Sequence, residues 1–161
     1  MILLPSAPVW LAGLLILLLA LAAIEDLWKL EISNWLCAAV AGCAFLAVAV
    51  DGPVTGIWQN ILLFAAVLGV GTLLFAKGWM GGGDIKLLAA CSLWFDLQQG
   101  WQLLVAVAIA GGLETLLVLL LRLLPWPSSA RSRLPVLRRD EGIPYGLAIG
   151  VGVLLVGLIA A

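Results

Sequence analysis

The chain has 161 residues, of which 65% are hydrophobic and 11% are charged, and its mean hydropathy is +1.22. An average soluble domain is about half apolar and about a quarter charged, so this chain cannot cover its own surface with polar groups. It holds 8 basic and 9 acidic residues and no histidine, so the net charge of −1 gives no reason to expect nucleic acid as a partner. The absence of histidine excludes a histidine base or a histidine-ligated metal, and no CxxC pair supports a zinc site.

Six stretches of the chain meet or approach the length of a membrane span, which needs about 20 mostly apolar residues. We therefore expect an all-α polytopic membrane protein with about six transmembrane helices. Residues 1–161 should form a single membrane-embedded domain with no separate soluble domain. The fourth stretch is short and reaches full length only if it extends from near Asp84 toward Gln99. The predicted spans are residues 8–24, 34–50, 57–76, 85–95, 102–124 and 143–161.

The positions of the basic residues predict how the chain is oriented, because Lys and Arg accumulate in cytoplasmic loops. All 8 basic residues fall at the first, third and fifth loops, and loops two and four hold none. The amino terminus should therefore lie outside the cytoplasm, with loops one, three and five inside it. The basic residues are Lys29 at the first loop, Lys77 and Lys86 at the third, and Arg122, Arg131, Arg133, Arg138 and Arg139 at the fifth.

The 8 tryptophans lie at or near the predicted helix ends. Tryptophan is enriched where a membrane meets water, so we interpret them as an aromatic belt and assign them no catalytic role. They are Trp10, Trp28, Trp35, Trp58, Trp79, Trp94, Trp101 and Trp126.

Two aspartates are the candidate chemical groups. Asp26 follows the first predicted span by two residues and Asp84 opens the fourth, so the predicted topology brings both carboxylates to the cytoplasmic face. A carboxylate in or beside hydrocarbon is costly and is a functional candidate for that reason. Two close carboxyls in a setting of low dielectric constant do not both ionise easily, so one can act as an acid and the other as a base. Such a pair can activate a water for attack on a carbonyl without a metal or cofactor.

A run of glycines precedes the second aspartate, from Gly81 through Gly82 to Gly83. Consecutive glycines allow another chain to approach the backbone closely, so these three residues are candidates for substrate binding. The alternative is that Asp84 is simply the N-cap of the fourth helix. Lys86 weakens that alternative, because a cation in the first turn opposes the helix dipole. Lys86 could contribute to substrate binding, bias the ionisation of Asp84, or extend toward lipid headgroups.

Three parts of the sequence resemble the type IV prepilin peptidases, bacterial members of the GxGD aspartyl proteases. Residues 81–90, which read GGGDIKLLAA, resemble the GxGD-x-K-L-L-A-A signature of that family. Residues 23–27 and 32–36 resemble its first aspartate motif, although Ser33 replaces the usual proline. Residues 143–146 resemble the start of its last helix.

The resemblance implies that Asp26 and Asp84 are the catalytic pair of an aspartyl endopeptidase that needs no metal or cofactor. It implies that the substrates are prepilins, whose basic leader peptides are cut at the cytoplasmic face of the bacterial inner membrane. No segment with paired CxxC motifs is present, so the chain is similar to the short, peptidase-only form associated with tight-adherence (Flp-type) pili. The particular prepilin, its cleavage sequence and the oligomeric state are not indicated.

Several acidic residues and a second class of function stay open. Glu114, inside the fifth span, either hydrogen-bonds a neighbouring helix or tunes the aspartate pair, and the structural role is favoured. Glu25 and Glu31 either meet a basic leader peptide or are solvated loop charges. An ion- or proton-coupled transporter is the alternative function, since intramembrane carboxylates also serve ion pathways. Transporter sites often occupy matching positions in inverted repeats, and Asp26 and Asp84 do not. A structural subunit would give no reason for the glycine run.

Overall fold

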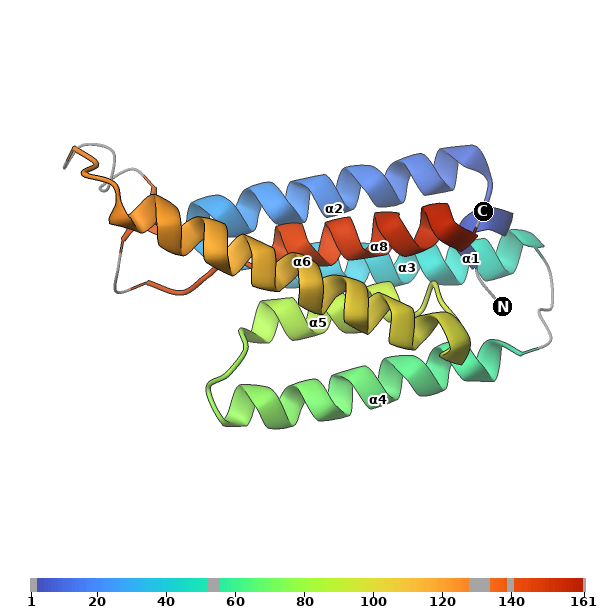
Figure 1. Cartoon of the computed structure of the whole chain (residues 1–161). Coiled ribbons are helices and arrows are strands. Elements are labelled where there is room, and N and C mark those ends of the chain that lie inside the picture. The colour runs from blue at the N-terminus through green and yellow to red at the C-terminus, as the bar shows by residue number, and fades with distance from the viewer. Residues whose placement is uncertain (1–2, 52–55, 128–133, 139–140, 161) are drawn as a thin grey trace.

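A computed structural model describes residues 3–51, 56–127, 134–138 and 141–160. This part of the chain is helical and contains no strand, so the predicted all-α fold class is confirmed. The helices form one bundle with their axes roughly along a common direction (Figure 1). Their bounds are α1 Leu3–Ser6, α2 Val9–Lys29, α3 Asn34–Asp51, α4 Ile57–Ala76, α5 Gly82–Ser92, α6 Leu97–Leu123, the 3₁₀ turn η1 Pro135–Leu137, and α8 Gly146–Ala160.

The helices differ in whether they are long enough to cross a membrane. Among the described residues, α2, α4 and α6 are long and apolar enough to span, and α3 and α8 are shorter apolar helices. The α5 helix has 11 residues, which at about 1.5 Å per residue covers roughly half of the hydrocarbon thickness. The bundle therefore supplies the six predicted helices, with the fourth at about half length.

The fourth helix does not extend toward Gln99, because the chain turns after Ser92 into a buried corner. Trp94 and the neighbouring Phe95 are fully buried there, and the indole N–H of Trp94 donates to the carbonyl of Val40 at 3.3 Å. Asn60 of α4 donates to the carbonyl of Leu93 at 2.9 Å. The prediction that Trp94 belongs to an interfacial belt is therefore wrong, because the ring anchors the turn between α5 and α6 in the core.

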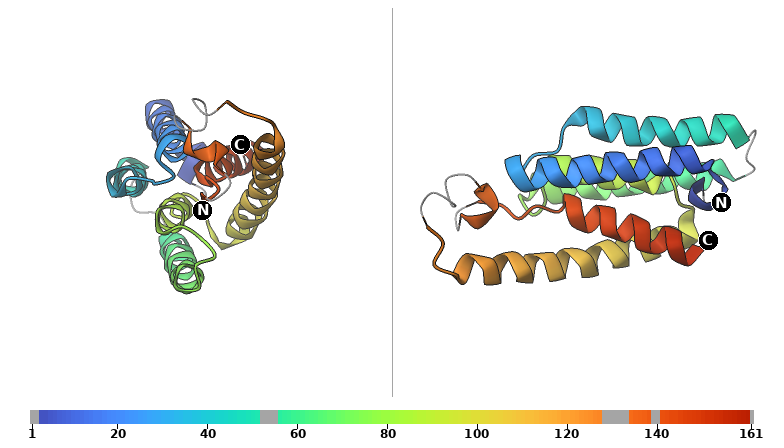
Figure 2. Two further views of the ribbon diagram at one scale, coloured as in Figure 1. Left: turned by 90° about the vertical axis from the view of Figure 1, so that its left-hand side faces the viewer. Right: turned by 90° about the horizontal axis from the view of Figure 1, so that it is seen from above.

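Two helices occupy the middle of the bundle (Figure 2). The α8 helix packs between α2 and α6, α5 packs between α3 and α4, and α5 and α8 also touch each other. Glycines on α8 allow this packing, since a β-carbon on Gly152 would lie 3.1 Å from the backbone nitrogen of Val107 on α6. Small residues at helix contacts are typical of membrane bundles, where close packing replaces the hydrophobic driving force.

Loops one and three and the described parts of loop five lie at one end of the bundle, on the left in Figure 1. The end of α2, the start of α5 and the start of α8 converge there, whereas α1, the turn between α5 and α6, and the end of α8 lie at the other end. The described basic residues belong to the first end, while Arg131, Arg133 and Arg139 lie outside the described residues. The predicted grouping of the loops is confirmed, and the side of the membrane on which they lie stays a prediction.

Candidate active site

Asp26 lies inside α2, one turn before the helix ends, and not beyond the span as the sequence predicts. The helix continues past the apolar run to Lys29, and so it includes Asp26. The Asp26 side chain is only 3% exposed, and its Oδ2 accepts a 2.7 Å hydrogen bond from the backbone N–H of Gly146, the first residue of α8. The carboxylate is therefore held between α2 and the amino-terminal end of α8.

The chain reverses direction directly after this turn of α2. Leu30 has φ 55 and ψ 30, and its N–H donates to the carbonyl of Asp26 at 2.8 Å. Within the described part of the chain it is the sole non-glycine residue with positive φ, a conformation that costs roughly 1–2 kcal/mol for an L-residue. This strained cap directs the first loop across the start of α5.

Asp84 lies in the first turn of α5 and is 8% exposed. The N-cap of α5 is Gly81, which has extended backbone angles and whose carbonyl accepts the helical bond from Ile85 N–H at 3.2 Å. The alternative that Asp84 is the N-cap is therefore wrong. Its carboxylate belongs to the third helical residue.

Two of the glycines before Asp84 have close neighbours, for two different reasons. A β-carbon on Gly81 would lie 2.6 Å from Oδ2 of Asp84, and one on Gly83 would lie 3.1 Å from the backbone nitrogen of Ile32. Gly81 thus leaves room for the carboxylate, and Gly83 lets α5 pack against the first loop. A β-carbon on Gly82 would meet the Phe75 ring at 3.3 Å, which is a contact with a side chain and not with backbone.

The two aspartates share one cavity of about 270 Å³ at this end of the bundle. Its walls are the glycine run, Lys86, the loop residues Leu30, Glu31 and Ile32, and Asn34 at the start of α3. Lys86 Nζ donates to Asn34 Oδ1 at 2.8 Å and so links α5 to α3 beside the cavity. No three Cys, Asp or Glu side chains among the described residues are grouped so that they could hold a metal ion. The arrangement offers two buried carboxyls beside exposed glycine backbone.

A larger hollow of about 800 Å³ runs along α6 and α8 and contains neither aspartate. Its lining is almost wholly apolar, as expected for helix surfaces that face lipid. Glu114 is the one ionisable side chain among its lining residues. The two aspartates therefore lie together in the smaller, polar cavity and apart from this apolar hollow.

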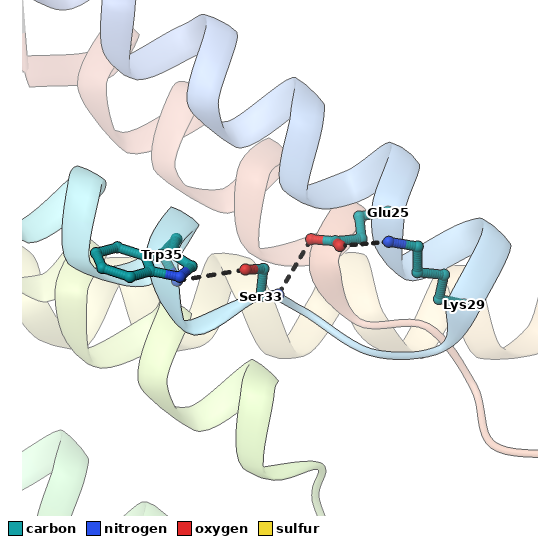
Figure 3. Close-up of polar contacts among 4 residues, drawn as sticks. All are labelled: Glu25, Lys29, Ser33 and Trp35. Atoms are coloured by element: carbon teal, nitrogen blue, oxygen red, sulfur yellow. Dashed lines mark hydrogen bonds and ion pairs between the residues drawn. The ribbon is translucent and has the colours of Figure 1, made fainter.

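The first loop is held by hydrogen bonds around Glu25 (Figure 3). Its Oε1 pairs with Lys29 Nζ at 2.9 Å, and its Oε2 accepts the backbone N–H of Ser33 at 3.1 Å. Ser33 precedes α3, and its Oγ accepts the N–H of Trp35 at 3.3 Å, as in an N-cap. A proline at position 33 would provide neither the N–H nor the hydroxyl, so the serine is part of this loop's hydrogen-bonding pattern.

One buried charge at the end of α6 is not predicted by the sequence analysis. Arg122, in the last turn of α6, is 7% exposed and donates to three backbone carbonyls, those of Val136 at 2.9 Å, Glu141 at 3.1 Å and Gly142 at 2.7 Å. The sequence predicts that Arg122 is one of the charges of the fifth loop. Its position on the buried stripe of α6, four residues after Val118, is the pattern that could have indicated its burial.

Comparison with known proteins adds the family. Residues 13–121 match the type IV leader peptidase family, a stretch of more than half of the chain. The chain belongs to the type IV leader peptidase family. No curated protein and no solved structure matches it. The matched stretch of this leader peptidase homologue includes Asp26, the glycine run and Asp84, whereas α8 lies beyond it.

Proposed function

We propose that this member of the type IV leader peptidase family is an aspartyl endopeptidase that removes the basic leader peptide from type IV prepilins, those of Flp-type pili included. The observation that carries the proposal is that Asp26 and Asp84, from α2 and α5, are both buried and line one cavity. The match to leader peptidases supports the substrate class. No observation favours the transporter alternative.

The geometry suggests which carboxyl starts as the base. Asp26 accepts the N–H of Gly146 at the positive end of α8, and both features stabilise a negative charge there. Ionised Asp26 would remove a proton from a water whose oxygen attacks the scissile carbonyl carbon. Protonated Asp84 would donate its proton to the carbonyl oxygen, giving a neutral tetrahedral diol. When the C–N bond breaks, the proton on Asp26 passes to the leaving amine and the diol returns one proton to Asp84.

The surroundings of the aspartates fit an extended basic peptide. Gly81 is exposed and Gly82 and Gly83 are half-buried at the cavity, so a peptide backbone can lie against them. Glu31 is exposed and also lines the cavity, whereas Glu25 is already engaged by Lys29 and Ser33. Glu31 is therefore the acidic residue proposed to meet the basic leader. Lys86 would contact the peptide from the α5 side.

The confinement of the basic residues to loops one, three and five supports placing this end of the bundle in the cytoplasm. The protein would then be a single membrane-embedded peptidase domain of the bacterial inner membrane, with its amino terminus outside. The leader peptide would be cut at the cytoplasmic face.

The decisive experiment is co-expression with Flp-type and other type IV prepilins, followed by gel mobility and mass spectrometry of the pilin. Wild-type protein should release the leader at one bond, and mass spectrometry identifies that bond. Inactive Asp26→Asn and Asp84→Asn proteins, checked for membrane insertion, distinguish this activity from host proteases. Failure of the inserted wild-type protein to shorten any prepilin would contradict the proposal.

A further inference from the structure

The first turn of α8 is held between two acidic side chains from different helices. Gly146 donates its N–H to Asp26 Oδ2 on α2 at 2.7 Å, and Ala148 donates its N–H to Glu114 Oε2 on α6 at 3.1 Å. The first N–H groups of a helix have no acceptor within the helix, so outside groups must accept these bonds. The sequence-based expectation that Glu114 hydrogen-bonds a neighbouring helix is confirmed.

The α6 helix also holds the chain just before this turn. Arg122 binds the carbonyls of Glu141 and Gly142. The Tyr145 hydroxyl lies 3.5 Å from Thr115 Oγ1. A β-carbon on Gly111 would lie 2.9 Å from the Tyr145 ring, so the ring packs directly on α6. From Glu141 to Ala148 the chain is therefore attached to α6 at successive points.

Glu114 lies away from the cavity that holds the aspartates. It is 8% exposed and is not among the residues that line that cavity. A peptide bound against Asp26 and Asp84 would not touch it there. A buried carboxyl is costly unless it is hydrogen-bonded, and Glu114 accepts its hydrogen bond from the same helical turn that binds Asp26.

We infer that Glu114 is a positioning residue for Asp26. Ala148 and Gly146 are two residues apart in one helical turn, so a shift of the first moves the second. By holding Ala148, Glu114 keeps the Gly146 N–H on Oδ2 of Asp26 and keeps that carboxylate aimed into the cavity. The effect on activity rests on the proposed function, whereas the effect on α8 does not.

The test compares Glu114→Leu with Glu114→Gln, and uses Leu120→Ala, at an exposed position of the same helix, as the control. The amide of glutamine keeps a carbonyl oxygen for Ala148, whereas leucine keeps only bulk. Hydrogen–deuterium exchange of the segment 146–148 in detergent micelles reports how firmly Glu114 holds the first turn of α8. The kcat and KM for prepilin cleavage report how that contact affects catalysis.

We expect Glu114→Leu to speed exchange across Gly146 and Ala148 and to lower kcat about 10- to 100-fold with little change in KM, because displacing a catalytic group by about 1 Å has that effect. Glu114→Gln should restore both readouts to within about threefold of wild type, as expected for a preserved hydrogen bond. A purely structural glutamate would lower the amount of folded protein without this split between kcat and KM.

Two results would overturn the inference. Unchanged exchange at residues 146–148 in Glu114→Leu would show that Glu114 does not hold α8. Faster exchange with unchanged kcat would show that the bond from Ala148 to Glu114 does not position Asp26 for catalysis. If wild-type protein cleaves no prepilin, the proposed function fails separately, and the exchange at Gly146 still decides whether Glu114 controls the contact to Asp26.

Discussion

Gly83 of α5 lies so close to Ile32 of the first loop that a β-carbon on Gly83 would come within 3.1 Å of the Ile32 backbone nitrogen. The contact joins the segment after Asp26 to the segment before Asp84, and it leaves both carboxyls on one cavity. Neither backbone can move aside easily, because Leu30 fixes one side of the contact and the start of α5 fixes the other.

Alanine substitutions in the glycine run should separate the role of Gly81, which leaves room for the Asp84 carboxylate, from that of Gly83, which packs on the first loop. Gly81→Ala should lower kcat at least about tenfold with little loss of stability, because its β-carbon displaces the Asp84 carboxylate. Gly83→Ala should lower the free energy of unfolding in detergent by about 1–3 kcal/mol, because the added β-carbon meets the backbone of Ile32. Gly112→Ala is the matched control, since a β-carbon there meets nothing within 4 Å. Equal effects of all three substitutions would contradict this assignment.

Neutralising either aspartate should abolish leader cleavage. Asp26→Asn and Asp84→Asn should each reduce the rate at least about 1,000-fold, and the double variant should be little worse, because groups that act as a unit are not additive. Both variants should still insert, and Asn at position 26 can still accept the Gly146 N–H. Cleavage is measured by gel mobility of the prepilin.

The control for the aspartate pair is Asp96→Asn at the opposite end of the bundle. Asp96 caps α6 by accepting the Gln99 N–H at 2.9 Å, and asparagine caps about equally well. This variant should keep wild-type activity. Substantial cleavage by a well-inserted Asp84→Asn protein would remove Asp84 from the proposed mechanism.

Ser33 should stabilise the first loop through its hydroxyl. Ser33→Ala loses the hydrogen bond from Trp35 N–H but keeps the N–H that binds Glu25. The free energy of unfolding in detergent should therefore fall by about 1 kcal/mol. Ser33→Thr keeps a hydroxyl and should unfold near the wild-type temperature. Ser33→Pro should be the least stable of the three, since it removes both bonds. A proline variant as stable as wild type would show that these bonds contribute little.

Arg122 should contribute far more to stability than a surface arginine. Arg122→Lys cannot reproduce three bonds to separate carbonyls, so the free energy of unfolding should fall by about 2–4 kcal/mol. Arg138→Lys is the matched control, because its pair with Glu141 at 3.3 Å is partly exposed and should change stability by less than about 1 kcal/mol. Thermal unfolding of both variants in the same detergent gives the comparison, and similar losses would contradict the role given to Arg122.

Cysteine labelling in intact cells tests the orientation. Trp58 near the start of α4 and Trp79 in the loop after its end are both exposed. The native cysteines are buried, so the wild-type chain provides a low background. A membrane-impermeant thiol reagent added outside should label Trp58→Cys and leave Trp79→Cys unlabelled until the cells are opened. The reverse pattern would place the aspartate cavity outside the cytoplasm.

Much of the fold was predictable from local sequence, because membrane solvation acts on each segment separately. Six apolar stretches became six helices, and the basic residues that the structure describes lie at one end. Asp26 and Asp84 could be singled out because a carboxylate beside an apolar run is costly wherever the rest of the chain lies.

The contacts that complete the site could not be predicted in this way, because they join residues far apart in the chain. The bond from Gly146 to Asp26 spans 120 residues and that from Ala148 to Glu114 spans 34. The burial of Trp94 and Arg122 likewise depends on which helices surround them and not on their neighbours in sequence. Apolar periodicity and loop charge decided which residues form helices and at which end the carboxylates lie, whereas the packing of α8 between α2 and α6 decided which backbone groups hold them.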